Sequence, residues 1–221
     1  MKTIRVTGKG QLKVRPDMTR ISISLEGTFP EYGETLRRSS EDTEVIRELL
    51  TGFGFERSEL KTLNFDVDTE YESYKDRGTY KQRLVGYKYR HQMKVEFVSD
   101  NERLGKVLYA LANCTINPEF RLSYTVKDPE EAKNELLMKA VLDSREKASV
   151  LTEAAGVSLK SIQTIDYSWG RIDFEVRPMR EMSVVDTCCE APSAAYGSYD
   201  MNIEPDDIEV SDTVTVVWEI E

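Results

Sequence analysis

The chain is poor in the residues from which most catalytic and metal sites are built. Its 221 residues include one histidine, His91, and three cysteines, Cys114, Cys188 and Cys189. This set is too small for a zinc site, which needs three or four protein ligands that converge. Three cysteines, two of them adjacent, give no disulfide framework and favour a reducing compartment. We therefore predict no catalytic, metal-binding or cofactor-binding residues, no cofactor and no enzymatic activity.

Long apolar runs and an excess of positive charge are also absent. No run approaches the roughly 18–20 apolar residues needed to cross a bilayer, so no integral membrane segment is expected. The net charge of −10 argues against a nucleic-acid surface. The start, IRVTGKGQLKV, has the pattern of a folded strand and not of a signal peptide. A cytoplasmic location is expected for the chain as given, and a periplasmic or envelope-associated one if a leader was removed.

The chain does contain a segment that occurs twice, about a hundred residues apart. One helix-patterned run reaches Gly54 and another reaches Gly156, and a strand pattern opens eight residues later at Thr62 and Thr164. Glycine suits the left-handed position that follows a helix. Threonine, being β-branched, suits the start of a strand. The repeat predicts a helix, a tight stop and a strand, twice.

The rest of the chain also divides into strand and helix patterns. Alternation of apolar and polar residues predicts strands within 3–29, 119–127, 162–176 and 207–220. Helical spacing predicts helices at 31–53, 100–112 and 130–155. A long hairpin is expected from 61–75 and 83–98 around Asp76-Arg77-Gly78. Gly8 and Gly10 suggest a bulge or bend in the first strand.

These elements predict an α+β fold in a single domain over 1–221. Two related β-α-β-β halves, about 3–98 and 116–221, would form a curved antiparallel sheet with the two long helices on one face and one short helix besides. The segment 177–206 is too long to be an ordinary connection between two elements, which predicts a flexible or functional loop.

The helix patterns predict caps and buried faces. The helix at 130–155 has Asp128 as a candidate N-cap and Pro129 at the first position. Ser99 and Glu102 fit a capping box for the helix at 100–112. The apolar face at 130–155 is broad and comprises Leu136, Leu137, Ala140, Val141, Ala148, Leu151, Ala154 and Ala155. The face at 31–53 is narrow and comprises Leu36, Thr43, Ile46, Leu49 and Leu50.

The long hairpin carries opposite charges and a group of tyrosines. If its polar faces coincide, Asp66 lies near Arg90 and Asp68 near Lys88, which predicts a salt-bridged ladder instead of a cation site. Interface aromatics or half-buried sheet positions both explain the tyrosines, which are Tyr71, Tyr74, Tyr80, Tyr87 and Tyr89.

Segments along nearly the whole chain resemble one known family. They are VTGKGQLKVRPDMTRISISLEG, GFGFERSELKT, GYKYRHQMKVEF, DPEEAKNELLMKAVLDSREKASVLTEAAGV and IEPDDIEVSDTVTVVWEIE. In their order and spacing they are similar to the SIMPL domain family. The resemblance implies an α+β fold of two related halves and homo-oligomers, some of them ring- or channel-like. It also implies that bacterial members are often exported and that some are linked to defence against oxidative stress. The family offers no agreed catalytic residues.

Four candidate sites remain from the residues themselves. His91 shares a face with Tyr89 and Met93, which indicates a satisfied, partly buried imidazole. Cys188 and Cys189 suggest a redox pair, but the acidic neighbours Asp186 and Glu190 raise a thiol pKa, which favours incidental loop cysteines. Cys114 is expected in the core. Gly8-Lys9-Gly10 lacks the helix, lysine and hydroxyl of a phosphate loop.

The function expected from these observations is that of a non-enzymatic, self-assembling SIMPL-domain protein with a stress-response or envelope-associated role. The hairpin at 61–98 is expected to protrude and to supply part of the subunit contact. One alternative is a small-ligand-binding module with a pocket between helices and sheet or under the 177–206 loop. Another is a thiol redox protein that uses Cys188 and Cys189.

Overall fold

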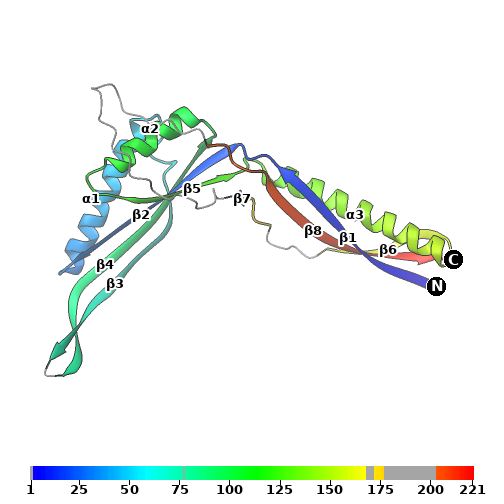
Figure 1. Ribbon diagram of the computed structural model, residues 1–221, viewed down its shortest axis with the longest axis horizontal. Helices are drawn as coiled ribbons and strands as arrows, with labels where there is room; N and C mark the ends of the chain where they lie inside the picture. The colour runs from blue at the N-terminus through cyan, green and yellow to red at the C-terminus, as the bar shows by residue number, and fades with distance from the viewer. Residues whose placement is uncertain (1, 77, 168–171, 177–202) are drawn as a thin grey trace. The chain divides into compact units, whose positions relative to one another are not determined.

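The strands and helices form an α+β protein with two antiparallel sheets (Figure 1). The computed structural model describes residues 2–76, 78–167, 172–176 and 203–221. In chain order the elements are β1 (Lys2–Val14), β2 (Met18–Phe29), α1 (Tyr32–Thr51), β3 (Lys61–Asp76), β4 (Thr79–Val98), α2 (Asn101–Ala112), β5 (Glu119–Thr125), α3 (Pro129–Ala154), β6 (Leu159–Asp166), β7 (Glu175–Val176) and β8 (Ile208–Ile220). The α+β class, with two long helices and one short helix, is confirmed.

The strands divide between a sheet ordered β1-β8-β6 and a sheet ordered β3-β4-β2-β5-β7, so the single curved sheet that the sequence predicts is replaced by two sheets. The chain separates into two compact units. The first unit comprises Met1–Asp17, Tyr124–Val176 and Pro205–Glu221, and the second comprises Met18–Ser123 and Arg177–Glu204. The single domain of two pseudo-repeats stays a prediction.

The two glycines of the repeated segment have the expected backbone conformation. Gly54 has φ 79° and Gly156 has φ 69°, both in the left-handed region. The next residue bonds back to the helix in each case: Phe55 N–H donates to the carbonyl of Leu50 at 3.3 Å, and Val157 N–H donates to that of Thr152 at 3.0 Å. Each helix is therefore stopped in the same way before β3 or β6 begins.

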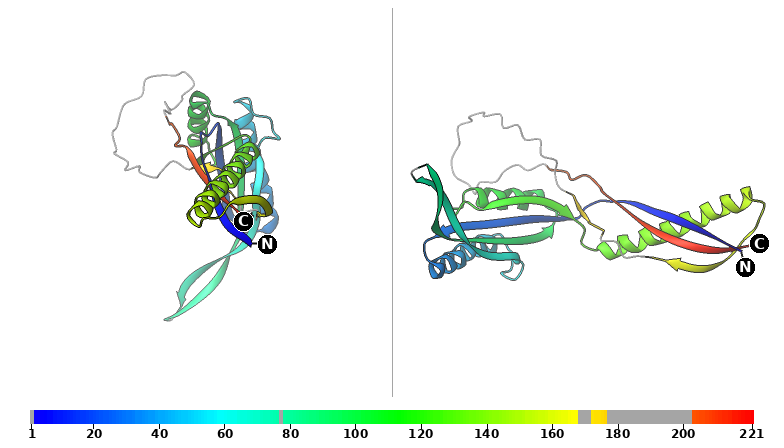
Figure 2. Two further views of the ribbon diagram at one scale, coloured as in Figure 1. Left: turned by 90° about the vertical axis from the view of Figure 1, so that its right-hand side faces the viewer. Right: turned by 90° about the horizontal axis from the view of Figure 1, so that it is seen from below.

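In the first unit, α3 lies along β1 and β8 at very short range (Figure 2). A Cβ atom at Gly8 would lie 1.9 Å from the carbonyl oxygen of Ala140, and one at Gly10 would lie 2.1 Å from that of Leu136. The register of β1 with β8 runs through both glycines without a shift. The predicted bulge is therefore wrong, because these glycines instead make room for the helix backbone.

The face that α3 buries follows from this close approach. It is a row of mostly small residues four apart: Ala132, Leu136, Ala140, Ser144, Ala148 and Thr152. The predicted broad apolar face is wrong at Leu151, which is 51% exposed. Ser144 links three elements, since its hydroxyl accepts a bond from Trp218 Nε1 at 3.3 Å and donates one to the carbonyl of Val6 at 3.5 Å.

Side chains of α3 also cover the outward edge of β1. The carboxylate of Asp143 accepts a hydrogen bond from the backbone N–H of Lys9 at 2.6 Å. Lys147 donates to the carbonyl of Thr7 at 3.5 Å and pairs with Asp143 at 2.7 Å. The bond from Lys147 and the one from Lys9 lower the pKa of Asp143. The other edge of this sheet is β6, where Ile162 and Ile165 are exposed.

The strand predicted at 162–176 is wrong as one element. Its first part belongs to β6, which pairs with β8, and its last two residues form β7, which pairs with β5. These two partners lie in different sheets, and residues 168–171 between β6 and β7 are outside the described residues. The predicted loop at 177–206 falls mainly outside the described residues.

The second unit has a core of large side chains between its sheet and helices α1 and α2. This core comprises Ile21, Ile23, Leu25, Ile46, Leu50, Phe55, Leu60, Tyr89, Met93, Val95, Phe97, Leu104, Val107, Leu108, Leu111 and Cys114. The buried face of α1 begins at Thr35. Leu36 was expected there, but it is 39% exposed.

The helix caps were predicted correctly for α3 but not for α2. Asp128 caps α3, with Pro129 at its start. At α2 the predicted capping box is wrong, because the side chain of Asp100 accepts the bonds from the backbone of Glu102 and Arg103. A carboxylate at the cap position makes the serine before it unnecessary for capping.

The hairpin of β3 and β4 is confirmed, and its outer part leaves the sheet as a two-stranded ribbon (Figure 1). The turn has Gly78 at φ 88°. Pairing of β2 with β4 ends at Phe29 and Tyr87, whereas β3 and β4 remain paired to Asp76 and Thr79. We call residues 70–86 of this hairpin, without the undescribed residue 77, the outer ribbon.

Candidate functional site

The candidate functional site is a small pocket over His91 in the second unit. It has a volume of about 220 Å³ and is lined by Leu36, Ser39, Ser40, Thr43, Arg47, Phe65 and His91. Helix α1 supplies five of these residues, and β3 and β4 supply one each. We call this the His91 pocket.

The imidazole of His91 is buried and bonded at both nitrogens. Nδ1 lies 2.9 Å from Oγ1 of Thr43, and Nε2 lies 2.9 Å from Oγ1 of Thr62. The hydroxyl of Thr43 donates its hydrogen to the carbonyl of Ser39 at 2.7 Å. Since a hydroxyl has one hydrogen, Thr43 accepts from Nδ1–H, and Nε2 accepts from Thr62. This is the satisfied imidazole that the sequence predicts.

The surroundings of His91 favour its neutral form. Burial lowers its pKa, and the positive charge of Arg47 lowers it further. The ring of Phe65 packs edge-on against the imidazole, with 5.2 Å between ring centroids. At neutral pH the floor of the pocket is therefore an uncharged imidazole beside hydroxyl groups.

A hydroxyl that donates to an imidazole is the first element of a nucleophilic dyad. Here, however, the group that orients the ring is the neutral hydroxyl of Thr43, which cannot stabilise an imidazolium as a carboxylate would. Among the described residues that line the pocket there is no acidic side chain. The pocket is also shallow and small. The lack of enzymatic activity stays a prediction.

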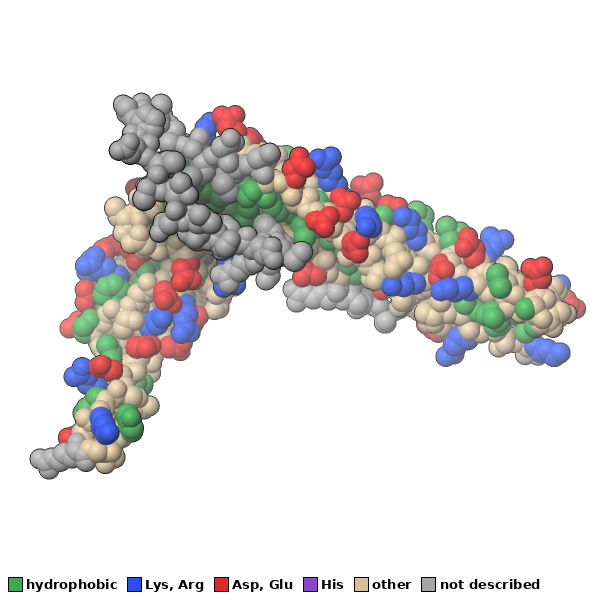
Figure 3. Space-filling model, in the orientation of Figure 1, with side chains coloured by type: hydrophobic (Ala, Val, Ile, Leu, Met, Phe, Trp, Pro, Cys, Tyr) green, Lys and Arg blue, Asp and Glu red, His purple; other side chains and the backbone are tan. Residues whose placement is uncertain are grey.

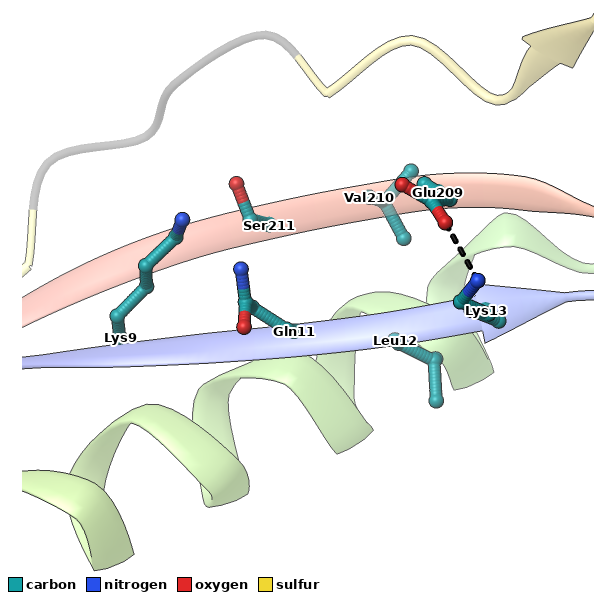
Figure 4. Close-up of a pocket in the computed structure, with 7 residues that line it drawn as sticks. All are labelled: Lys9, Gln11, Leu12, Lys13, Glu209, Val210 and Ser211. Atoms are coloured by element: carbon teal, nitrogen blue, oxygen red, sulfur yellow. Dashed lines mark ion pairs between the residues drawn. The ribbon is translucent and has the colours of Figure 1, made fainter.

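A second, open pocket lies on the outer face of β1 and β8 in the first unit (Figure 4). Its volume is about 510 Å³, and Lys9, Gln11 and Ser211 are among its lining residues. Lys13 and Glu209 form an ion pair of 2.6 Å across the two strands, which raises the pKa of Lys13. The lining residues include no nucleophile with a base beside it, so this pocket offers no evident chemistry.

The charged ladder on the hairpin is confirmed with one difference. Asp66 pairs with Arg90 and Asp68 with Lys88 in the strand register, as predicted. Arg90 lies 4.0 Å from Asp66 and 3.8 Å from Asp68. Lys88, however, forms its ion pair with Glu26 of β2 at 2.9 Å. Exposed pairs of this kind stabilise a sheet by about 0.2–1 kcal/mol each, which supports a structural role.

The tyrosines of the hairpin belong to two environments. Tyr89 is in the core, where its hydroxyl donates to Asp42 of α1, and burial and this bond raise its pKa. Tyr71, Tyr74 and Tyr80 are exposed on the outer ribbon. In the space-filling view, apolar side chains lie between charged ones along this ribbon (Figure 3). Burial in the sheet therefore explains Tyr89, whereas the interface explanation of the exposed tyrosines stays a prediction.

The cysteines provide no described site. Cys114 lies in the core of the second unit, as predicted. Cys188 and Cys189 lie outside the described residues, so the thiol redox hypothesis stays a prediction. Within the described ranges, no group of three or more His, Cys, Asp or Glu side chains could hold a metal ion. No helix of the described chain is both long and apolar enough to cross a membrane.

Sequence reasoning missed the two hydroxyl partners of His91 and the one basic residue of its pocket. Thr62 and Thr43 were assigned to a strand and a helix face without their bonds to His91. Arg47 had no assignment at all. The only usable signal was that Thr43 and Arg47 are four apart on one helix, which places both on neighbouring turns.

Comparison with known proteins gives one family and two relatives. The family model described as SIMPL, "Protein of unknown function (DUF541)", matches residues 4–218. The chain is 26% identical over 163 residues to a 26 kDa periplasmic immunogenic protein of Brucella abortus and 25% identical to the protein of the same name from Brucella melitensis biotype 1. Each alignment covers 73% of this chain but only 65% of the relative.

Proposed function

Since this chain belongs to the SIMPL family, we propose that it is a non-enzymatic, self-assembling protein whose copies contact one another through the outer ribbon. The family description assigns no activity. The proposal is supported by one observation, an exposed apolar face on the outer ribbon.

The two faces of the outer ribbon differ in chemistry. Residues that are directly opposite in an antiparallel pair share a face. One face carries two ion pairs, Glu72 with Arg83 at 2.7 Å and Asp76 with Lys81 at 2.6 Å. The other face carries three large exposed side chains, Tyr71, Leu84 and Tyr80, which are 54%, 49% and 77% exposed. The register places Ser73, Gln82 and Lys75 on the same face.

This apolar face continues the face that α1 covers in the body of the second unit. Val67 lies opposite Tyr89, and four residues further along β3, Tyr71 lies opposite Leu84. Alternate residues of a strand keep to one face. Tyr89 is buried under α1, where it bonds Asp42, but the helix does not extend over the outer ribbon. Exposed apolar patches of this kind are typical of protein interfaces.

Self-association of the whole protein tests this proposal. We expect oligomers in size-exclusion chromatography with light scattering, and we expect the double variant Tyr71→Ser/Tyr80→Ser to dissociate at least ten times more readily. The matched control is Leu142→Ser/Val150→Ser, which removes two exposed apolar side chains from α3 and leaves the assembly intact. A wild-type chain that stays a monomer at high micromolar concentration overturns the proposal.

A periplasmic or envelope-associated location is proposed with this function, and its support is the name of the two Brucella relatives. Fractionation of cells that express the native gene distinguishes this location from the cytoplasmic one. Recovery in the cytoplasmic fraction alone contradicts it. The role in stress response rests on the family resemblance and stays a prediction.

Small-ligand binding at the His91 pocket is a second candidate function. The observation that favours it is the pocket itself, which lies between a helix and a sheet, combines buried polar groups with exposed apolar walls and contains a cation. Small-molecule sites combine apolar walls with a few polar groups that fix the orientation of the ligand, and this pocket has both kinds of group, with two apolar residues among its seven.

A further inference from the structure

The His91 pocket has a charge opposite to that of the chain. The protein has 40 acidic and 30 basic residues. Of the described residues that line the pocket, however, one is basic, Arg47, and none is acidic. The wall of the pocket is therefore locally positive on an acidic protein. Such a site attracts an anion.

The charge of Arg47 is only loosely compensated by its neighbours. Its nearest carboxylate is Glu44, at 3.7 Å. Glu44 is itself held at 2.5 Å by Arg57, and the hydrogen bond from Arg57 is the main cause of its lowered pKa. Two arginines therefore share one carboxylate, and the nearer one is Arg57. A guanidinium in this position can form a bidentate pair with a ligand carboxylate.

The apolar walls of the pocket are unusually open. Leu36 is 39% exposed and Phe65 is 45% exposed, although both lie beside a buried floor. The floor itself is polar and consists of the buried side chains of Ser39, Thr43 and His91. An apolar group between Leu36 and Phe65 would remove both side chains from water, which is favourable.

We propose that the His91 pocket binds a small carboxylate that carries an apolar or aromatic group. This ligand class rests on the ligand-binding function proposed above. The carboxylate pairs with Arg47, and the apolar group lies between Leu36 and Phe65. The volume of about 220 Å³ is below the roughly 300–1,000 Å³ of pockets for drug-sized ligands. The ligand is therefore no larger than a single substituted ring or a short branched chain.

The single histidine gives a direct measurement. In proton NMR of the full chain, His91 is the only source of a histidine Hε1 signal. We expect sodium benzoate at about 10 mM, ten times a Kd of about 1 mM, to shift this signal with saturation. Bound benzoate is also expected to raise the pKa of His91, because an anion nearby stabilises the imidazolium.

Variants on one helix test the role of the cation. Arg47→Gln is expected to weaken benzoate binding at least ten-fold. The matched control is Arg37→Gln, on the same helix, whose side chain pairs with Glu41 at 2.7 Å and does not line the pocket. We expect this control to bind benzoate as the wild type does. Equal loss in both variants, or none in either, overturns the pairing with Arg47.

Two further probes separate the ligand class from ligand binding itself. Benzamide has the same ring without the charge, and acetate has the charge without the ring; each is expected to bind at least ten times more weakly than benzoate. If benzamide shifts the His91 signal as benzoate does, the carboxylate class is wrong and ligand binding stands. If none of the three probes shifts it, both proposals are overturned.

Discussion

Helices α1 and α3 both pack on an antiparallel sheet, but the contacts that hold them differ in kind. Between α1 and its sheet lie large side chains, among them Ile46 and Leu50 of the helix and Met93 of β4. Under α3 lie Gly8 and Gly10, and the helix presents mostly alanine, serine and threonine to them. The interface of α1 is filled by side chains alone, whereas that of α3 combines a side-chain core that includes Trp218 with a close approach of two backbones at Gly8 and Gly10.

This difference decides what each interface tolerates. A core of large side chains loses free energy when atoms are removed, because a cavity remains. The interface under α3 also buries large side chains, among them Val216, Trp218 and Leu136. At Gly8 and Gly10, however, it has no room for an added carbon. We therefore expect truncation of core residues to destabilise either unit, and enlargement at Gly8 or Gly10 to destabilise the first unit as well. Three measurements can break or sharpen this contrast.

The largest effect is expected from Ile46→Ala in α1. Ile46 is fully buried in the core of the second unit. Its truncation should lower the free energy of unfolding by about 2–5 kcal/mol, measured by urea denaturation followed by circular dichroism. The control is Leu142→Ala on the exposed side of α3, which should change stability by less than about 0.5 kcal/mol. Equal losses in the two variants would mean that burial does not distinguish these positions.

The next effect is expected from Gly8→Ala in β1. The added methyl group would lie 1.9 Å from the carbonyl oxygen of Ala140, so α3 must move away from the sheet. The free energy of unfolding should fall by about 1–3 kcal/mol.

Gly33→Ala in α1 is the matched control for this substitution. A Cβ atom there meets nothing within 4 Å, and alanine has the higher helix propensity by up to about 1 kcal/mol. This variant should be at least as stable as the wild type. If Gly8→Ala were also neutral, α3 would not be in backbone contact with β1.

The smallest effect is expected from the protonation of His91. Its folded pKa lies below the ordinary value of 6.5, so the unfolded chain binds the proton more readily. The stability that neutral His91 contributes is complete above pH 6.5 and is lost as the pH falls through the folded pKa. Between about pH 7.5 and pH 5, the wild type should therefore lose more stability than His91→Gln does. Parallel losses in the two proteins would show that the histidine is not buried in its neutral form.

Positions that follow from strand alternation could be predicted from the sequence, whereas the close packing of α3 on β1 could not. Alternation along β4 placed Tyr89, His91 and Met93 on one face correctly, because a strand has a fixed period of two. The ladder of Asp66 and Arg90 followed from the same rule. The burial predicted for Leu151 of α3 was wrong, because hydrophobicity alone does not reveal that a helix buries its small residues. Only the glycines of β1 carried that information, and they also fit a bulge.

The His91 pocket shows a similar limit. The sequence indicates that a lone histidine on an apolar face has its bonds satisfied, because a buried imidazole needs partners. It does not identify them, since Thr43 and Thr62 come from segments 48 and 29 residues away. Arg47 could not be recognised either. Arg47 is only loosely paired because Glu44 lies closer to Arg57. That contact depends on the folded position of the turn after α1.

The covered edge of β1 sets a limit on aggregation. Asp143 and Lys147 occupy the outward backbone groups at Lys9 and Thr7, so a foreign strand could bond there only by displacing α3. Among the strands that the structure describes in this sheet, β6 is the remaining edge. A sheet that can be extended from one side can join a single neighbour and then stops, whereas one that is open on both sides can grow into a fibre. We therefore expect Asp143 and Lys147 to oppose the addition of a foreign strand to β1 at Lys9 and Thr7.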